Sequence, residues 1–395
     1  MSGRMQRVKE YAESVFPWVL AVKDALHQIP EAGFEEVKTA RTLENILTEL
    51  QIPFGRMCKT GIVAVIEGRY PGKTVAVRAD VVGLPVTEQP QNPVCSLHPG
   101  SMHACGHDAH MAIALGTARY FAENREQLCG NVKLLFQPAE ETDGGALPMI
   151  SAGCLENPPV DFCIGQHVQP YLQVGEAECR KGVLNGASNT MEVKVLGKGG
   201  HGASPHNAVD AVAIAAHLVC ALQTLVSREV DPADSAVISI GKIQGGTAGN
   251  IIADTVRFRG IIRTVSQNTR EHLKKRIPAL IEGIARGMGG GALVDLQDGY
   301  EALVNDGGCV DVFNQAAAEY LGPEKVFEKE SPGLGVEDFA FFARQVPSVF
   351  YHIGCSDKAK RENGQLHSSS FQVEPETLKF GVGLQIYTVL KLLGG

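Results

Sequence analysis

The sequence lacks an excess of positive charge, an apolar N-terminal run and a long apolar stretch. Its net charge is −8 over 395 residues, which leaves no basic field to hold nucleic acid or anionic lipid. Residues 1–13 are polar and charged, so no signal peptide is expected, and no run of eighteen apolar residues suggests a membrane span. We therefore expect a cytoplasmic protein whose partners include neither nucleic acid nor membrane.

Regular cysteine spacing, internal repeats and a phosphate-binding loop are also missing. Ten cysteines are scattered along the chain, and only Cys105 has neighbours of the kind that bind metals. In a reducing compartment we interpret most of them as small buried hydrophobic residues. The glycine-rich segments 197–202, 245–246 and 287–291 do not have the strand, loop and helix context of a phosphate cradle, so no nucleotide site is expected.

The chain is long enough for two domains with separate cores, since 44% of its residues are hydrophobic and 20% are charged. Strand and helix patterns alternate in its first part. The helices are predicted at 7–26, 35–50 and 110–124, and the strands at 62–67, 74–78, 131–137 and 161–168. This alternation predicts an α/β domain with a largely parallel sheet, in which ligands bind at strand ends.

The pattern changes from about Gly182. Strands are predicted at 190–197, 236–245, 255–263 and 292–298, and helices at 210–227 and 267–287. The order β-α-β-β-α-β is typical of a ferredoxin-like α+β unit. Helices at 311–320 and 375–393 and a strand at 348–353 then return to the first pattern. The sequence thus predicts a discontinuous α/β domain, 1–181 and 299–395, with an α+β domain inserted at 182–298.

The segment from His103 to His110 carries the strongest chemical pattern, with one thiol, three imidazoles and a carboxylate in eight positions. Cysteine thiolate and neutral imidazole are preferred ligands of zinc and similar ions, and the spacing of Cys105 and His107 lets both reach one centre. A buried structural histidine is the alternative interpretation of this segment.

Glu140 and Glu141 directly follow the apolar strand predicted at 131–137. One carboxylate of such a pair can bind a metal while its neighbour takes a proton from water that the cation has acidified. A solvated helix start is the simpler interpretation when the pair is considered alone. Asp80 and His167 also lie at or near predicted strand ends, so this chemistry is expected at one edge of the sheet.

The remaining histidines are weaker candidates. His167 and His367 could each be a ligand or an ordinary polar residue. Five others have no neighbouring cluster and are interpreted as ordinary residues: His27, His98, His217, His272 and His352.

Several motifs together resemble those of a known family. They are Arg78-Ala79-Asp80, the segments 102–108, 136–141 and 200–206, and Glu337-Asp338-Phe339-Ala340. In this order they are similar to the dinuclear metallo-aminoacylase and carboxypeptidase family, in the branch of hippurate hydrolases and auxin-conjugate amidohydrolases. The resemblance extends from about His27 to His367, which is nearly the whole chain.

The resemblance implies a metallopeptidase-like catalytic domain with two divalent ions, of which zinc, manganese, cobalt and nickel are all candidates. By motif position, Cys105 would bridge the ions. His107 and His167 would complete one site, and Glu141 and His367 the other. Glu140 would be the general base, and Asp80 would orient a ligand imidazole by a hydrogen bond.

The inserted domain would be a lid that also forms a homodimer. By resemblance, His201 would donate to the developing oxyanion and could reach across a dimer into the site of the other subunit. Asn250 and Arg263 match lid positions that hold the carboxylate of the substrate, for which an arginine fork is well suited. Taken alone, Arg263 could equally be a surface residue after a strand, and Asn250 could only shape a turn.

Two positions depart from the family pattern. Val82 replaces the second acid of an Asp-Met-Asp-Ala-Leu-Pro motif, so any hydrogen bond of that acid is lost. Val336 precedes Glu337 where a small polar residue is common. These changes put fine substrate contacts in question, and they do not touch the expected ligands.

The function predicted from these features is metal-assisted hydrolysis of N-acyl or N-aroyl amino acids, with Glu140 as the proton carrier. Dipeptidase or carboxypeptidase activity at the same ions is the first alternative. A cysteine hydrolase with Cys105 as its nucleophile and a metal-storage protein without activity are further alternatives.

Overall fold

The computed structural model describes residues 3–357 and 364–394, which form two compact units. The first comprises the described parts of Met1–Gly182, Val304–Glu330 and Phe341–Gly395, and the second comprises Val183–Leu303 and Ser331–Ala340. The predicted mixed α/β class is confirmed. The second unit extends beyond the predicted end at 298. Segment 331–340 joins it because the backbone of Gly333 hydrogen-bonds to Leu184 and Gly186.

An eight-stranded sheet runs through the first unit. Its strands in spatial order are β1 (Phe54–Met57), β2 (Gly61–Glu67), β4 (Cys129–Gln137), β3 (Tyr70–Asp80), β5 (Phe162–Gln173), β16 (Ser348–Ser356), β6 (Ala177–Cys179) and β15 (Val326–Glu328). The central strands β4, β3, β5 and β16 are parallel. The predicted parallel character therefore holds at the centre and again between β6 and β15 at one edge, whereas β1, β2 and β6 pair antiparallel with their inner neighbours. β1 and β2 are antiparallel because a turn of three residues joins them.

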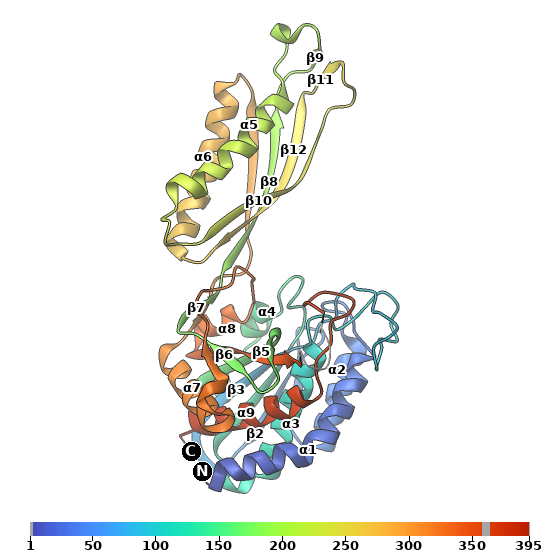
Figure 1. The fold of residues 1–395 in the computed structure, drawn as a ribbon, viewed down its shortest axis with the longest axis vertical. Coiled ribbons are helices and arrows are strands. Elements are labelled where there is room, and N and C mark those ends of the chain that lie inside the picture. The colour runs from blue at the N-terminus through green and yellow to red at the C-terminus, as the bar shows by residue number, and fades with distance from the viewer. Residues whose placement is uncertain (1–2, 358–363, 395) are drawn as a thin grey trace. The chain divides into compact units, whose positions relative to one another are not determined.

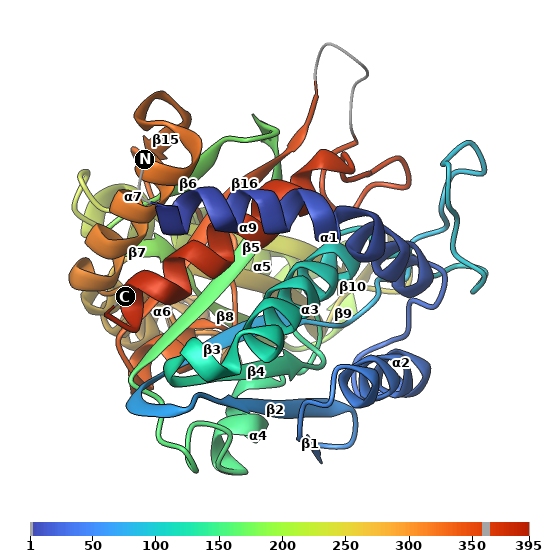
Figure 2. The same ribbon diagram turned by 90° about the horizontal axis from the view of Figure 1, so that it is seen from below.

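The described part of the first unit holds, wholly or in part, seven α-helices: α1 (Gly3–His27), α2 (Val37–Glu49), α3 (His107–Glu123), α4 (Ala146–Ser151), α7 (Gly307–Leu321), α8 (Ala340–Gln345) and α9 (Glu376–Leu392). Helices α1, α3 and α9 pack against one another (Figure 2). Gly116 lies where they meet, and a Cβ there would come within 2.9 Å of both Val19 and Val382. A larger residue would separate these helices.

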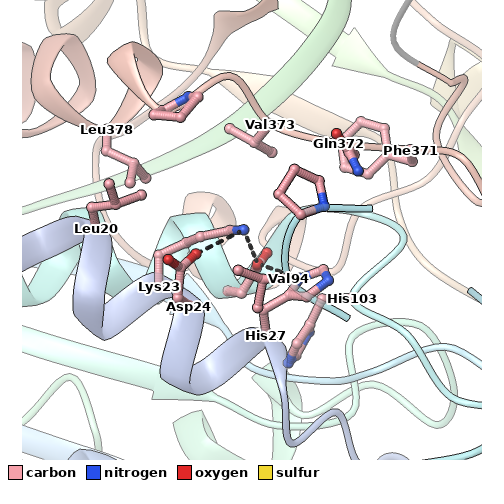
Figure 3. A pocket seen from close by; sticks show the side chains of 13 residues that line it. Leu20, Lys23, Asp24, His27, Val94, His103, Phe371, Gln372, Val373 and Leu378 are labelled. Carbon is pink, nitrogen blue, oxygen red and sulfur yellow. Dashed lines mark hydrogen bonds and ion pairs between the residues drawn. The ribbon is translucent and has the colours of Figure 1, made fainter. Parts of the chain in front are cut away.

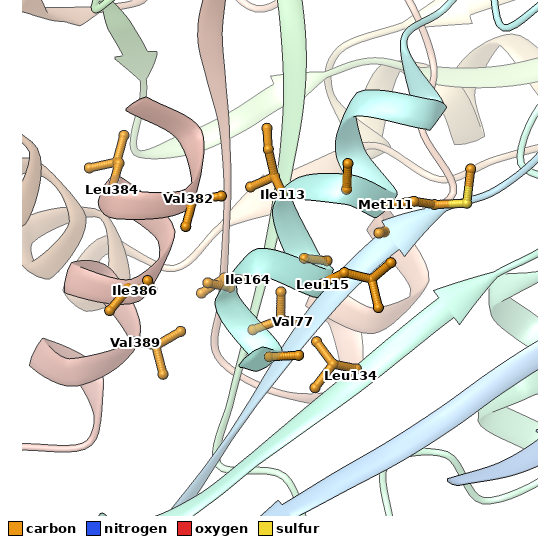
Figure 4. Packing of buried hydrophobic residues seen from close by; sticks show 14 of the residues in the cluster. Val77, Met111, Ile113, Leu115, Leu134, Ile164, Val382, Leu384, Ile386 and Val389 are labelled. Atoms are coloured by element: carbon orange, nitrogen blue, oxygen red, sulfur yellow. The ribbon is translucent and has the colours of Figure 1, made fainter. Parts of the chain in front are cut away.

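The core of this unit lies between α3, α9 and the parallel strands (Figure 4). Val77, Leu134 and Ile164 come from β3, β4 and β5, and Ile113 of α3 and Val382 of α9 complete the packing. All five are fully buried, and burying each such side chain stabilises the fold by about 1.5–3 kcal/mol. This packing holds the start of α3 close to the carboxyl ends of the strands.

The second unit has a core of its own. Its antiparallel sheet has the order β10 (Ala236–Gly245), β12 (Thr255–Thr264), β8 (Ala187–Leu196) and β13 (Gly291–Asp298). Helices α5 (Ala211–Thr224) and α6 (Gln267–Gly287) contact each other and this sheet, as Figure 1 shows. A small sheet of this unit pairs β9 (Gly200–His201) with β11 (Ile251–Ile252). The short strands β7 (Gly182–Asn185) and β14 (Leu303–Asn305) lie at two of the points where the chain passes from one unit to the other. The chain order β8-α5-β10-β12-α6-β13 matches the predicted α+β pattern.

Helix α5 is unusually apolar. Ala211–Glu229 is the one segment of the described chain whose length and mean hydropathy, 1.5, would suit a membrane span. Its buried side chains, Ile214, Leu218 and Leu222 among them, belong to the core of the second unit. Val212 and Ala216 lie exposed. The segment therefore has the packing of a core helix with an additional apolar face.

Candidate metal centre

Polar residues follow the central strands at one edge of the large sheet. Asp80 ends β3, the segment with Glu140 and Glu141 follows β4, and His167 lies in β5. Because these strands are parallel, their carboxyl ends lie along the same edge. The sequence predicts that the chemistry converges there, and the structure brings these side chains together.

Two groups of three side chains share the sulfur of Cys105. The first is Cys105, His107 and His167, and the second is Cys105, Glu141 and His367. Within each group the donor atoms lie no more than 4.8 Å apart. Cys105 Sγ is 3.2 Å from His167 Nε2, and Glu141 Oε1 is 3.0 Å from His367 Nε2. All five predicted ligands thus meet at one place.

Backbone carbonyls orient two of the imidazoles. His107 Nδ1 donates to the carbonyl oxygen of Val82 at 2.7 Å, and His167 Nδ1 donates to that of Val168 at 2.7 Å. In a neutral imidazole, an Nδ1–H leaves the lone pair on Nε2, and this is the tautomer that binds a metal through Nε2. His107 Nε2 is buried and has no hydrogen-bond partner among the described residues.

The charges around Cys105 favour the binding of a cation. Burial, together with the carboxylates of Glu141, Glu140 and Asp80, raises the pKa of the Cys105 thiol well above its usual range. A cation among these groups would stabilise the thiolate and offset the repulsion between the acids. Sulfur, nitrogen and oxygen donors in one set suit zinc and other first-row divalent ions. The residues present therefore fit a metal.

Glu140 stands apart from both groups that share Cys105. It is 8% exposed, and a carboxylate oxygen of Glu140 lies within 4.8 Å of donor atoms of His107 and Glu141. It is thus close to the candidate ligands without belonging to either trio. A carboxylate in this position can hold or move a proton beside the ions.

The structure corrects the prediction for Asp80. Its Oδ1 accepts a hydrogen bond from His110 Nδ1 at 2.7 Å and its Oδ2 accepts one from Arg78 at 2.6 Å. His110 Nε2 in turn accepts from the backbone N–H of Val168 at 3.0 Å. Asp80 therefore orients His110, which belongs to neither trio. His107 cannot offer its Nδ1–H to Asp80 because the Val82 carbonyl already holds it.

Two residues at this centre have strained backbones. Ala139, which precedes Glu140, has φ +57°, and His367 has φ +64°. Such left-handed conformations cost a residue other than glycine about 1–2 kcal/mol. The backbone N–H of His367 donates to the carbonyl oxygen of Ala104 at 2.8 Å, next to Cys105. Strain held by surrounding contacts is common at functional sites.

In the second unit, His201 and Asn250 lie on two neighbouring segments, at the pairing of β9 with β11. The backbone of His201 pairs with Ile251, and the Asn250 carbonyl accepts from the N–H of Gly202 at 2.9 Å. His201 is exposed, and its Nδ1 accepts from the N–H of Ala203 at 3.0 Å. The proton of the neutral ring is then on Nε2, which makes Nε2 a hydrogen-bond donor.

Arg263 lies far from His201 and Asn250 within the same unit. It stands near the end of β12, eight residues after Thr255, and an extended strand of that length spans roughly 26 Å. Arg263 is half-buried, and its Nη1 donates to the carbonyl of Ile262 at 3.2 Å. One copy of the second unit therefore does not bring Asn250 and Arg263 to the same point.

A pocket of about 250 Å³ adjoins the first turn of α3 (Figure 3). His27, which the sequence analysis interprets as an ordinary residue, bonds through Nδ1 to Asp108 at 2.8 Å and through Nε2 to Glu88 at 3.0 Å. Lys23 Nζ lies 3.6 Å from Asp108. Burial works to lower the pKa of His27, but the two carboxylates outweigh it and raise the pKa to about 9. His27 is thus a buried, ion-paired cation beside the metal centre.

The chain belongs to peptidase family M20/M25/M40, whose model matches residues 76–391. This confirms the resemblance found in the sequence. It is similar to an N-acetyldiaminopimelate deacetylase of Halalkalibacterium halodurans, with 41% identity over 93% of this chain and 97% of the relative. It is also similar to the IAA-amino acid hydrolase ILR1-like 4 of Arabidopsis thaliana, with 36% identity over 93% of this chain and 84% of the relative.

Solved structures agree with this membership. A protein of methicillin-resistant Staphylococcus aureus matches with a TM-score of 0.91 and 34% identity, over 98% of this chain and 99% of that one. The YXEP protein of Bacillus subtilis, a dinuclear metal-binding peptidase of the M20 family, matches with a TM-score of 0.84 and 30% identity, over 97% and 99% of the two chains. The protein is a metal-dependent amide hydrolase, as predicted.

Proposed function

We propose that this protein hydrolyses the amide bond of N-acyl or N-aroyl amino acids, releasing a carboxylic acid and a free amino acid. The observation that carries the proposal is a buried acid, Glu140, next to two groups of candidate ligands that share one sulfur. The relatives named as a deacetylase and an IAA-amino acid hydrolase support the substrate class.

Two divalent ions are proposed as cofactors, one held by Cys105, His107 and His167 and the other by Cys105, Glu141 and His367. When bound, such ions polarise a carbonyl group and lower the pKa of water. Zinc, manganese, cobalt and nickel all tolerate this donor set, and their availability in the cell often decides among them. The two histidines whose Nδ1 atoms donate to backbone carbonyls turn their Nε2 atoms towards the proposed ions.

Glu140 is proposed to take the proton from the attacking water and to return it to the leaving amine. This role needs a carboxylate that is close to the ions without being consumed as a ligand, and the position of Glu140 meets this need. A positioned general base typically accelerates such reactions by 10²–10⁴-fold. His201 is proposed to stabilise the oxyanion through its Nε2–H, a contribution commonly worth about 3 kcal/mol.

Replacement of Glu140 tests the function. Glu140→Gln is expected to lower kcat for N-acetyl and N-benzoyl amino acids by at least about 10²-fold while metal content, measured by elemental analysis, stays at the wild-type level. Glu67→Gln, exposed at the end of β2, is the matched control and should retain full activity. Full activity in Glu140→Gln would overturn the assignment.

A substrate and metal panel separates the remaining alternatives. Dipeptides turned over faster than N-acyl amino acids would assign a dipeptidase instead. Chelation is expected to abolish activity, and re-addition of each metal in turn should restore it to different degrees. Activity that survives chelation and is lost on thiol alkylation would favour Cys105 as a nucleophile.

We also propose a homodimer formed through the second unit. β10 is an edge strand, and α5, which contacts it, leaves Val212 49% exposed. An unpaired strand edge beside an apolar helix face can pair with the same surface of a second copy. The distance between Asn250 and Arg263 within one copy supports a substrate site to which two copies contribute.

Light scattering tests the dimer. Wild-type protein is expected to have the mass of two chains at micromolar concentration, and the double variant Val212→Glu/Ala216→Glu that of one. Leu293→Glu, on the opposite edge strand β13 and 61% exposed, should remain dimeric. A monomeric wild type, or a double variant that stays dimeric, would contradict this interface.

A further inference from the structure

We propose that Glu36 is a positioning residue, whose buried carboxylate fixes the turn that carries Glu140 by holding the backbone N–H of Ala139. The inference rests on the proposed role of Glu140 and adds a residue about one hundred positions away in the sequence. Glu36 would act on the reaction through the backbone, without touching substrate or metal.

The carboxylate of Glu36 makes hydrogen bonds to two segments outside α2. Its Oε1 accepts from the N–H of Ala139 at 2.9 Å, and its Oε2 accepts from the hydroxyl of Thr60 at 2.6 Å. Glu36 is 0% exposed and Thr60 is 2% exposed. Burial raises the pKa of Glu36, while these hydrogen bonds favour the charged form. A buried acid with such specific partners needs a structural or functional reason.

Capping of α2 does not explain why the carboxylate of Glu36 is buried. Glu36 occupies the N-cap position of α2 but makes no capping hydrogen bond with its side chain. Glu31 does this instead, because its Oε2 accepts from the N–H groups of Lys38 and Thr39 at 2.8 and 2.9 Å. The carboxylate of Glu36 is thereby left to bind the turn after β4.

The backbone conformation of that turn must be imposed by contacts from other segments. Ala139 has φ +57°, a conformation that persists only when surrounding contacts impose it. Gly33 packs directly on it, since a Cβ at Gly33 would lie 3.0 Å from the Cα of Ala139 and 2.2 Å from the Thr142 hydroxyl. The loop between α1 and α2 thus holds the turn in place, by packing at Gly33 and by the hydrogen bond of Glu36. Release of Ala139 would move Glu140, the next residue.

Substitutions at Glu36 test this role by kinetics. Glu36→Ala is expected to lower kcat about ten- to hundredfold, the effect of a small misplacement of a reacting group, with KM changed less than twofold. Glu36→Gln keeps an acceptor for Ala139 and should retain kcat within about threefold. Glu36→Asp keeps the charge but is one methylene too short, so its kcat should fall towards that of Glu36→Ala.

Glu31→Ala is the matched control, since it removes a carboxylate from the same helix start without releasing Ala139. It should lose stability and keep its kcat. Equal kcat losses in Glu31→Ala and Glu36→Ala would show that Glu36 has only a structural role, which would contradict the proposal. Wild-type kcat in Glu36→Ala, or full activity in Glu36→Asp together with a poor Glu36→Gln, would overturn the proposal.

Hydrogen exchange tests the same contact independently of the proposed function. Amide exchange in segment 138–144 should accelerate at least tenfold in Glu36→Ala and Glu36→Asp but not in Glu36→Gln or Glu31→Ala. Unchanged exchange in segment 138–144 would show that Glu36 does not hold the turn, even if no amide substrate is found. If Glu36→Ala does not fold, the comparison of Glu36→Gln with Glu36→Asp decides by both measurements.

Discussion

Single histidines of this protein differ in what their two ring nitrogens contact. In His107 and His167, Nδ1 donates to a backbone carbonyl and Nε2 faces the metal centre. In His110 both nitrogens are occupied, one by Asp80 and one by a backbone N–H. In His27 both face carboxylates. The group that each ring nitrogen contacts therefore decides whether a histidine of this chain is a candidate ligand, holds a neighbouring residue in place or is a cation.

The cationic His27 predicts a pH dependence of stability. Because its pKa is raised from 6.5 to about 9 in the folded state, the protonated ring stabilises the fold fully below pH 6.5, and this contribution is lost as the pH rises through 9. The full contribution is about 3 kcal/mol, against which the nearby Lys23 acts. In urea unfolding, the difference between wild type and His27→Gln should shrink steadily from pH 6.5 to 9.5.

Exposed His217 on α5 supplies the control for this measurement, since its ring contacts only a backbone carbonyl in the described structure. His217→Gln should show a constant difference from wild type over the same range. A constant difference for His27→Gln as well would show that His27 is not the titrating group.

At the residue scale, the sequence predicted which candidate ligands lie together better than it predicted which residues orient them. Cys105 and His107 are neighbours in the chain, so their shared purpose is visible in the spacing. Asp80 could bond to either His107 or His110, which lie one turn apart on α3, and only the position of the Val82 carbonyl decides between them. Glu36 was missed altogether, because its contact with Ala139 joins segments that no sequence pattern connects.

At the scale of elements, the parallel strands β4, β3 and β5 explain why distant residues converge, and this part of the fold was predictable from their apolar runs. β6 and β15 have three residues each, which is too short for a periodic pattern. The antiparallel pairing at the sides of the sheet also depends on turns, and the predicted parallel sheet did not include it.

The start of α3 yields a prediction about Gly106, which has φ +85° and separates Cys105 from His107. A Cβ there would lie 2.4 Å from Val168 Cγ2. Gly106→Ala should therefore destabilise the fold by about 2 kcal/mol and weaken metal binding at least tenfold, as the ligands on both sides shift. Chelator competition and urea unfolding measure the two effects.

Gly100→Ala is the matched comparison, because Gly100 has φ +80° but no atom within 4 Å of the added Cβ. It should cost about 1 kcal/mol of stability and leave metal binding unchanged. Equal metal affinities in the two variants would show that the close approach to Val168 does not control the ligands.

At the scale of the whole molecule, two units with separate hydrophobic cores are expected to unfold in two calorimetric transitions. Only the first unit holds the five candidate ligands, so chelation should lower the midpoint of one transition by several degrees and leave the other in place. Leu222→Ala, in the core of the second unit, should shift the other transition, with a loss of about 2–5 kcal/mol. A single transition that moves as one in both experiments would contradict this independence.

The order of the candidate ligands along the chain has a consequence for synthesis. Cys105, His107 and His167 leave the ribosome in the first half of translation, whereas His367 follows more than half the chain later. A nascent chain therefore contains every member of the first trio well before the second is complete. A product released between residues 167 and 367 would carry the first trio without His367 and without α9, which packs against the helix that begins at His107, so it should bind a metal weakly and hydrolyse nothing.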